Sequence, residues 1–430
     1  MRATSGFSGL GAAFLLLVLA APARAEYLAA TGPGPVAPAP EHAHLLTASA
    51  ETIEPPPPRG YAEDIRQARD AGARPFVPPG RLQEDAVEDA GISQLQQSAP
   101  KAPALTRSFN GIDYTGTYPP DPVLAAGPSN LVLSTNGSVT IRDKTGNLVA
   151  STSLASFFVS VRVSGENAFD PKVIYDEGSQ RFFVAALGRI NNPSCSAGSC
   201  VSHFFLAVSK SASPAGTGSS DWYFYAFDGT LDGSTPTANW VDFTGLGADA
   251  NVVVLSANMF SFSTSFFQKA KIRILPKATL IAGGAVTWND FFGMTEPGSG
   301  FLSFTLQPAL TFGNPGTFFL VSASSTSGSC NLTVWGIANA LTAPALSSQT
   351  AAAGGTCNFP PFATQLGGGI PLDTSDKRLY NAVYRGNSIW TAHTIQWNWG
   401  SGNVAAVRGV QVNVGSWPTV SYTQNGTFGT

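Results

Sequence analysis

The sequence is poor in charge and in long apolar runs, and each shortage excludes a class of protein. Charged residues make up 12% of the 430 residues, and 24 Lys and Arg against 27 Asp and Glu give a formal net charge of -3. Nucleic-acid-binding proteins usually carry a basic excess, so we expect no nucleic-acid partner. Beyond the first 25 residues no apolar run approaches the roughly 20 residues that span a bilayer, so we expect no transmembrane segment.

Short catalytic motifs are also absent. The chain contains no G-x-S-x-G, H-E-x-x-H or G-x-x-x-x-G-K-[ST] sequence, and these are local signatures of serine hydrolases, zinc proteases and nucleotide-binding proteins. The catalytic residues are therefore unknown at this point, and we expect no cofactor. A site in this chain has to be assembled from residues that lie far apart in the sequence.

Cysteine is scarce, and the four residues fall into two close pairs, Cys195 with Cys200 and Cys330 with Cys357. An even number of cysteines in an exported chain indicates disulfides, and proximity in the sequence favours these two pairs over the other two connectivities. Zinc ligation is the alternative. It is disfavoured because the spacings are not C-x-x-C and His203 is the one histidine nearby.

The N-terminal quarter of the chain predicts export. Residues 1–25 combine Arg2, an apolar run and the small-residue sequence Ala23-Arg24-Ala25, which is the pattern of a secretory signal peptide; a membrane anchor is the alternative. Residues 26–104 are rich in Ala and Pro and lack apolar periodicity, which predicts a disordered tether or pro-segment. We therefore predict a secreted protein, extracellular or periplasmic, whose folded domain spans residues 105–430.

The folded domain is built from repeated hairpins. Residues 170–190 show the pattern: KVIY and RFFVAAL are β-branched and aromatic runs, and the polar, Gly-containing DEGSQ links them. Five copies can be aligned by the first residue of the first strand. These residues are Asp121, Asp170, Asp242, Gln307 and Arg378.

Each copy continues with further strand candidates. Second strands are NLVLSTN, RFFVAAL, NVVVLSAN, TFFLVSA and SIWTAHT; third strands are SVTIRDK, HFFLAVSK, KIRILPK, LTVWGI and AVRGVQV; fourth strands are NLVAST, WYFYAFD, AVTWNDF, ALSSQ and TVSYTQ. Four antiparallel strands recurring at intervals of about 50 to 72 residues are typical of propeller blades. We predict an all-β fold, a β-propeller of four-stranded antiparallel blades, with a β-sandwich as the alternative.

Several phrases resemble a family of secreted bacterial β-propeller proteins, loosely grouped with sialidase-like (BNR-type) repeat proteins. They are PPDPVLAAGPSN, FDPKVIYDEGSQRFF, KIRILPKATLI and RLYNAVYRGNSIWTAHT. The resemblance covers residues 110–430 and implies fold and export rather than an activity, since the family has none that is settled. Members usually continue past Thr430, so three expectations stay open: a ring of five blades, a sixth blade in an incomplete chain, or an extra strand from residues 104–112. The sialidase box S-x-D-x-G-x-T-W is absent.

The repeat alignment also predicts a site. The first residues of the first strands share one face of a propeller with the ends of the second strands, which bring Asn136, Asn258 and His393. Asp121, Asp170, Asp242, Arg378 and His393 would then form a polar funnel for a hydroxyl-rich ligand or a cation. The alternative for each is structural: an Asp before Pro often caps a turn, Arg378 has Asp376 beside it, and His393 fits a satisfied histidine at a strand end.

Two functions follow from this funnel. The first is a monomeric, non-catalytic surface module that recognises a carbohydrate or other small hydroxyl-rich molecule. The alternative is a glycosidase that uses the funnel carboxylates, because glycoside hydrolysis needs two carboxyl groups. Asp228 to Asp232 is a weaker candidate for a calcium loop, because it lacks the full spacing and the closing Glu.

Overall fold

The computed structural model describes residues 29–31, 107–117, 119–365 and 371–429. The predicted signal peptide lies outside the described residues, and so does the predicted tether apart from three residues. Those three form strand β1 (Ala29–Thr31), which pairs antiparallel with strand β15 (Asn289–Phe292) of the folded domain.

The described domain is almost entirely β-structure and contains five successive sets of four antiparallel strands. Each set is called a sheet below, although the last three sets and β1 form one continuous 13-stranded sheet. The first holds β2 (Val123–Ala126), β3 (Asn130–Ser134), β4 (Ser138–Asp143) and β5 (Leu148–Ser153). The second holds β6 (Asn167–Asp176), β7 (Arg181–Arg189), β8 (Ser202–Ser209) and β9 (Trp222–Asp228). The third holds β12 (Asn239–Ala248), β13 (Val252–Ser261), β14 (Phe267–Pro276) and β15.

The last two sheets follow the same order. The fourth holds β16 (Gln307–Thr311), β17 (Phe318–Ala323), β18 (Leu332–Ala338) and β19 (Ala345–Ala351). The fifth holds β20 (Leu379–Arg385), β21 (Ser388–Asn398), β22 (Asn403–Ser416) and β23 (Thr419–Phe428). The strands predicted for each of the five copies are therefore confirmed. The described part of the extra strand considered at residues 104–112 forms no strand.

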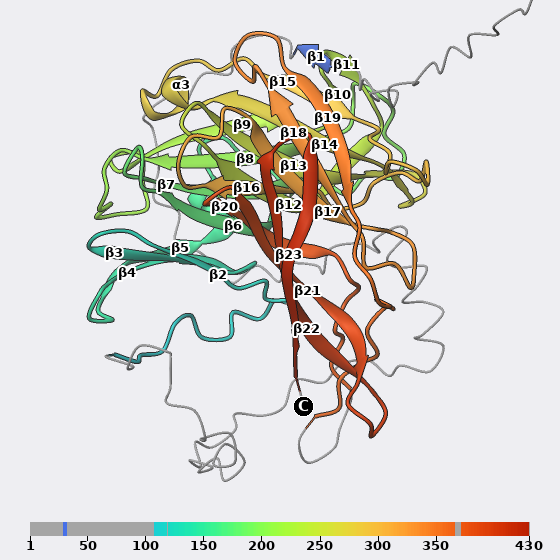
Figure 1. Ribbon diagram of the computed structural model, residues 1–430. Helices are drawn as coiled ribbons and strands as arrows, with labels where there is room; N and C mark the ends of the chain where they lie inside the picture. The colour runs from blue at the N-terminus through green and yellow to red at the C-terminus, as the bar shows by residue number, and fades with distance from the viewer. Residues whose placement is uncertain (1–28, 32–106, 118, 366–370, 430) are drawn as a thin grey trace, which may run out of the picture.

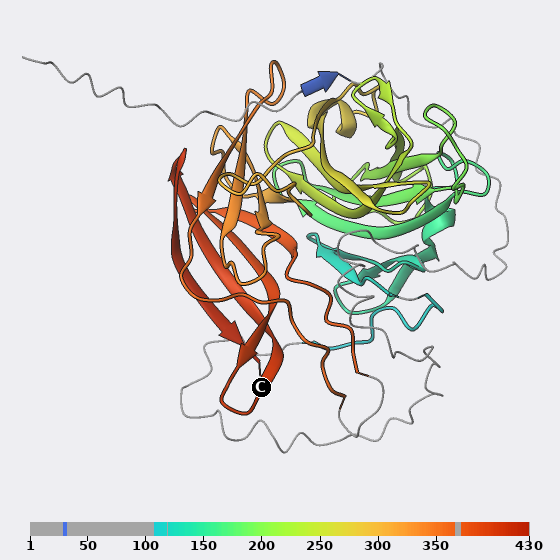
Figure 2. The same cartoon turned by 90° about the vertical axis from the view of Figure 1, so that its right-hand side faces the viewer.

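The first strands of the sheets lie next to one another and parallel. β12 pairs with β16 and β16 with β20, which joins the third, fourth and fifth sheets, and β6 packs against both β2 and β12. Successive sheets are therefore neighbours in space as well as in sequence. Figures 1 and 2 show the sheets stacked in this order around the first strands, with the first sheet (teal) and the last (red) well apart in Figure 2.

Hydrophobic cores fill the spaces between successive sheets. One core holds Val132 with Phe182, the next Phe204 with Leu255, the third Ile272 with Trp335, and the fourth Val334 with Val412. Both faces of the inner sheets are covered, which explains why strands such as β7 and β13 are apolar runs without alternation. This packing rules out a sandwich of two sheets.

The elements outside the sheets are short. Helices α2 (Leu154–Phe157) and α3 (Lys277–Ile281) have one turn each, and β10 (Leu231–Asp232) with β11 (Thr235–Pro236) forms a small hairpin. The predicted disulfides Cys195–Cys200 and Cys330–Cys357 are both present. In the described part of the chain, no helix has the length and apolar character needed to cross a membrane.

Candidate functional site

The first strands begin with a backbone irregularity that changes the sequence alignment. In the second, third and fifth sheets a bulge interrupts the pairing, between Phe169 and Lys172, between Asp242 and Gly245, and between Leu379 and Ala382. The first residue inside each bulge is Asp170, Phe243 and Tyr380 respectively. An extra residue moves every later side chain to the other face, which the sequence pattern does not reveal.

Backbone angles support the same correspondence. Asp121, Asp170, Phe243 and Thr305 have φ of 44°, 51°, 58° and 56°, a region that Asp tolerates better than most residues and that is strained for a β-branched Thr. The structural equivalents of Asp121 and Asp170 are therefore Phe243 and Thr305, and Tyr380 corresponds to them by its place in the bulge, although its φ lies outside this region. The sequence alignment had placed Asp242, Gln307 and Arg378 there, so it was out of register by one or two residues in three sheets.

Asp121 and Asp170 are joined through Asn136. The Asn136 amide nitrogen donates to Asp121 Oδ2 at 2.9 Å, and its oxygen accepts from the Asp170 backbone N–H at 2.6 Å. Asp170 Oδ2 in turn accepts from the Phe243 N–H at 2.9 Å. Asn258 repeats the device by accepting from the Thr305 N–H at 2.8 Å. These bonds connect the first sheet to the second, the second to the third and the third to the segment that leads into the fourth, so Asp170, which is 6% exposed, has a structural role.

Asp242 and Arg378 are also buried. Asp242 has no exposed surface, and Arg378 has almost none. The Arg378 guanidinium makes two bonds to Asp376, from Nε at 2.8 Å and from Nη2 at 2.5 Å, and its carbon lies 4.5 Å and 4.9 Å from the ring centres of Phe243 and Phe304. A bidentate pair enclosed by two rings holds a guanidinium firmly. Neither residue is accessible to a ligand in this structure.

His393 on β21 lies opposite the residue that follows Arg378. It is opposite Leu379 in the strand register, it is buried, and its Nδ1 is 2.8 Å from the carbonyl oxygen of Lys377. Burial is the main cause that lowers the pKa of His393 to about 4, so the ring is neutral at pH 7 and Nδ1 is the donor. A neutral, buried imidazole of this kind is a structural residue rather than a ligand-binding cation.

Lys172 is the residue at this face that sequence reasoning missed. It lies on β6, and its ammonium donates to the carbonyl oxygen of Tyr380 on β20 at 2.8 Å, which links the second sheet to the fifth. Burial lowers the pKa of Lys172, while the charges of Asp170 and Asp121 act in the opposite direction. The lysine therefore stands beside both carboxylates. Its position directly after the recurrent Asp-Pro was the signal in the sequence, since Asp170 and Pro171 occupy the bulge.

Two aromatic rings complete this group. Phe243 and Tyr380 have ring centres 5.7 Å apart, and the Lys172 ammonium is 6.0 Å from the Phe243 ring centre. Tyr380 is 38% exposed, and Lys172, Phe243 and Asp121 are partly exposed. We call this group the strand-start cluster; it consists of Asp121, Asp170, Lys172, Phe243 and Tyr380. It combines one partly exposed cation, one partly exposed carboxylate and an aromatic surface.

The candidate calcium loop has a different role. Asp228 accepts from the N–H and hydroxyl of Thr230 at 2.8 Å and 2.7 Å, and Asp232 forms ion pairs with Lys269 and Lys271. Two ammonium groups already neutralise Asp232, so a metal cation would be repelled there. Within the described residues no group of three or more His, Cys, Asp or Glu side chains is placed to hold a metal ion.

Comparison with known proteins gives weak likenesses. No family model matches the chain, and no curated protein matches it. Solved structures similar to it include an exo-β-1,3-galactanase from Clostridium thermocellum, with 11% identity and a TM-score of 0.31 over 70% of this chain and 60% of the galactanase. An arabinanase from Bacillus subtilis shares 16% identity at a TM-score of 0.30, over 70% of this chain and 96% of that one.

A third similar structure is an endo-1,5-α-L-arabinanase from Thermotoga petrophila, with 12% identity and a TM-score of 0.34 over 70% of this chain and 73% of the arabinanase. This chain thus spans less than two thirds of the galactanase. All three likenesses are too low to support an argument about this protein. The function has to be inferred from its own residues.

Proposed function

We propose that the five sheets are the blades of a five-bladed β-propeller, and that the protein is a secreted module that binds a glycan at the strand-start cluster. The parallel first strands, the meander order of each sheet and the cores between successive sheets support the propeller. The two disulfides support an oxidising, extracytoplasmic location.

The observation that carries the binding proposal is the contact between Lys172 and the Tyr380 carbonyl. It brings a cation, the carboxylate of Asp121 and the ring of Tyr380 from three sheets to one accessible place. The C–H face of a sugar packs on an aromatic ring, while its hydroxyls donate to a carboxylate and accept from an ammonium. Lys172 gives one of its three N–H donors to Tyr380, so it can also bind a ligand hydroxyl.

Glycan binding by purified protein, followed by titration of two variants, tests this proposal. Tyr380→Ala and Lys172→Met should each weaken binding at least about fivefold, because each removes one of the three contacts expected for the sugar. Trp390→Ala and Lys210→Met are matched controls: Trp390 on β21 is 41% exposed and Lys210 is partly exposed, and both lie outside the cluster. Equal loss in the controls, or no loss in the cluster variants, would contradict the proposal.

Glycoside hydrolysis is the second candidate, because Asp121 and Asp170 are two carboxylates acting on the same lysine. Retaining and inverting glycosidases both need such a pair. The backbone bond to Asp170 and its burial weigh against this candidate, and the weak likeness to glycosidases adds nothing to it. Release of reducing ends from polysaccharides, abolished by Asp121→Asn and unaffected by Tyr380→Ala at saturating substrate, would favour hydrolysis over binding.

A further inference from the structure

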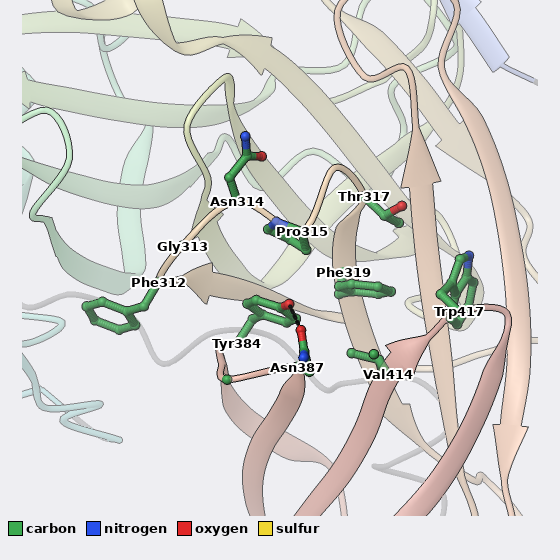
Figure 3. Close-up of a pocket in the computed structure, with 12 residues that line it drawn as sticks. Phe312, Gly313, Asn314, Pro315, Thr317, Phe319, Tyr384, Asn387, Val414 and Trp417 are labelled. Carbon is green, nitrogen blue, oxygen red and sulfur yellow. Dashed lines mark hydrogen bonds between the residues drawn. The ribbon is translucent and has the colours of Figure 1, made fainter.

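A cavity of about 530 Å³ lies between the fourth and fifth sheets. It is at the end of the molecule opposite to the strand-start cluster, because its walls come from residues just after β16, from the turn between β20 and β21, and from the turn between β22 and β23. Figure 3 shows Tyr384, Phe319 and Trp417 in a row along one side, with Phe312 at the opposite end. Its volume lies within the range of about 300–1,000 Å³ typical of sites for small ligands.

Aromatic rings form one wall of the cavity. Phe319 and Tyr384 are stacked, with ring centres 5.6 Å apart and planes 16° from parallel, and Trp417 meets Phe319 edge to face at 5.3 Å. Phe312 lies at the other end of the cavity (Figure 3). Phe319 and Tyr384 are buried behind the wall, whereas Trp417 and Phe312 are partly exposed, so the aromatic surface on which a ring-shaped molecule can lie is that of Trp417, supported by Phe319.

Two glycines fix the side chains of this wall. A Cβ at Gly336 on β18 would lie 2.7 Å from the Trp417 ring, and a Cβ at Gly415 would lie 2.9 Å from Cβ of Asn387. The absence of a side chain at these two positions lets Trp417 and Asn387 approach the sheets closely. The wall is therefore held in place by backbone packing before any ligand binds, which reduces the entropy lost on binding.

The polar groups of the cavity are uncharged. None of the twelve lining residues is Asp, Glu, Lys, Arg or His, and the polar side chains come from Asn314, Thr317, Tyr384 and Asn387. The Tyr384 hydroxyl donates to Asn387 Oδ1 at 3.2 Å, which orients the Asn387 amide so that its N–H₂ is the donor group. The site thus offers hydroxyl and amide groups around an aromatic floor, and no charge to attract an ion.

A second cavity extends this space. It has a volume of about 320 Å³, shares Phe312 and Gly313 with the first, and is lined on its far side by Asp176 and Lys277. Those two form a buried ion pair with a separation of 2.8 Å, but Glu177 and Asp249 also line this cavity, so its far side carries a net negative charge. A ligand longer than one ring can still continue from the first cavity across Gly313.

We propose that this cavity binds one ring of a neutral oligosaccharide, with the sugar packed on the partly exposed ring of Trp417 and its hydroxyls bonded to Asn387, Asn314 and Thr317. This site is separate from the strand-start cluster and does not depend on the function proposed there. The uncharged lining excludes uronic acids and phosphates, and the polar rim excludes a purely apolar ligand.

Isothermal titration calorimetry on the full chain tests the proposal with five probes: neutral trisaccharides of glucose, galactose and arabinose, trigalacturonic acid, and a nine-residue proline peptide. At least one neutral trisaccharide should bind, and trigalacturonic acid should bind at least about tenfold more weakly. Trp417→Ala and Asn387→Ala should each lower the affinity for the neutral sugar at least about fivefold, whereas Trp417→Phe should retain most of that affinity. Trp390→Ala is the control and should change nothing.

Four outcomes would overturn the proposal: none of the neutral trisaccharides binds, the proline peptide binds more tightly than any sugar, trigalacturonic acid binds as well as the neutral sugars, or Trp417→Ala and Asn387→Ala retain full affinity. Asn387 is exposed, so its variant keeps the test valid if Trp417→Ala does not fold. Lys172→Met separates the two sites. If Lys172→Met loses sugar binding and Asn387→Ala keeps it, the strand-start proposal stands and the cavity proposal is refuted. If Asn387→Ala loses sugar binding and Lys172→Met keeps it, the cavity proposal stands and the strand-start proposal is refuted.

Discussion

Two buried arginines in this protein have nearly the same surroundings but lie in different regions. Arg273 on β14 bonds Asp290 through Nε at 2.8 Å and Nη2 at 2.7 Å, and its guanidinium carbon is 4.4 Å from the Trp288 ring centre. Arg378 bonds Asp376 in the same bidentate way and lies against Phe243. The first pair is enclosed within the third sheet and its neighbours, whereas the second borders the partly exposed strand-start cluster.

This comparison shows why Arg378 is a misleading site candidate. Arg273 also bonds the carbonyls of Asp228 and Leu231, which ties the hairpin of β10 and β11 to the third sheet. An arginine held by a carboxylate and an aromatic ring is therefore a repeated structural device in this fold. What distinguishes the region around Arg378 is its neighbours, Lys172 and Tyr380, which remain accessible.

The largest effect on stability is expected from breaking the enclosed pair. Asp290→Ala leaves the buried Arg273 charge without its carboxylate, and we expect the free energy of unfolding to fall by about 3–5 kcal/mol. Chemical denaturation measures it. Adding Arg273→Met to Asp290→Ala should recover part of the loss, because the unpaired charge is then gone. A loss below about 1 kcal/mol for the single variant would mean that the Arg273–Asp290 pair contributes little to the stability of the fold.

An intermediate effect is expected from the pH dependence of His393. The unfolded chain binds a proton near pH 6.5, but the folded chain does so near pH 4, so the unfolded state binds more protons between these values. Stability from this residue is complete above pH 6.5 and is lost as the pH falls towards 4, by roughly 3 kcal/mol in total.

His393→Asn is the matched variant for that measurement, because Asn258 occupies the equivalent position on β13, opposite Asp242. Denaturation curves at several pH values between 4 and 7 should show that the variant loses less stability on acidification than the parent protein. Parallel curves for the two proteins would show that the pKa of His393 is the same in the folded and unfolded states, which would contradict this prediction.

The smallest effect is expected from Asp376→Ala. Asp376 is slightly exposed, so water can reach the space left by the carboxylate, and Arg378 keeps its contacts with Phe243 and Phe304. We expect a loss of about 2 kcal/mol, the range for a bond to a charged group, and a clearly smaller loss than in Asp290→Ala under the same conditions. If Asp290→Ala and Asp376→Ala lose the same free energy of unfolding, the enclosed Arg273–Asp290 pair and the Arg378–Asp376 pair beside the cluster contribute equally to stability.

Most of the fold could be predicted from the sequence because strands and turns are local. Runs such as RFFVAAL and NVVVLSAN are apolar, β-branched and aromatic, and the polar links between them set the hairpins, so the five copies and their strand order follow from the chain alone. The pairing of Cys195 with Cys200 and of Cys330 with Cys357 was likewise indicated by their spacing.

The position of the proposed site, in contrast, depends on the tertiary structure. A bulge of one extra residue at the start of a strand leaves no mark in composition, yet it exchanges the two faces of the strand and puts Phe243 and Tyr380 where Asp242 and Arg378 were expected. The partnership of Lys172 with Tyr380 spans 208 residues, and no local pattern encodes a contact at that separation. Whether a charged side chain faces a ligand or holds two sheets together depends on which residues the fold brings against it.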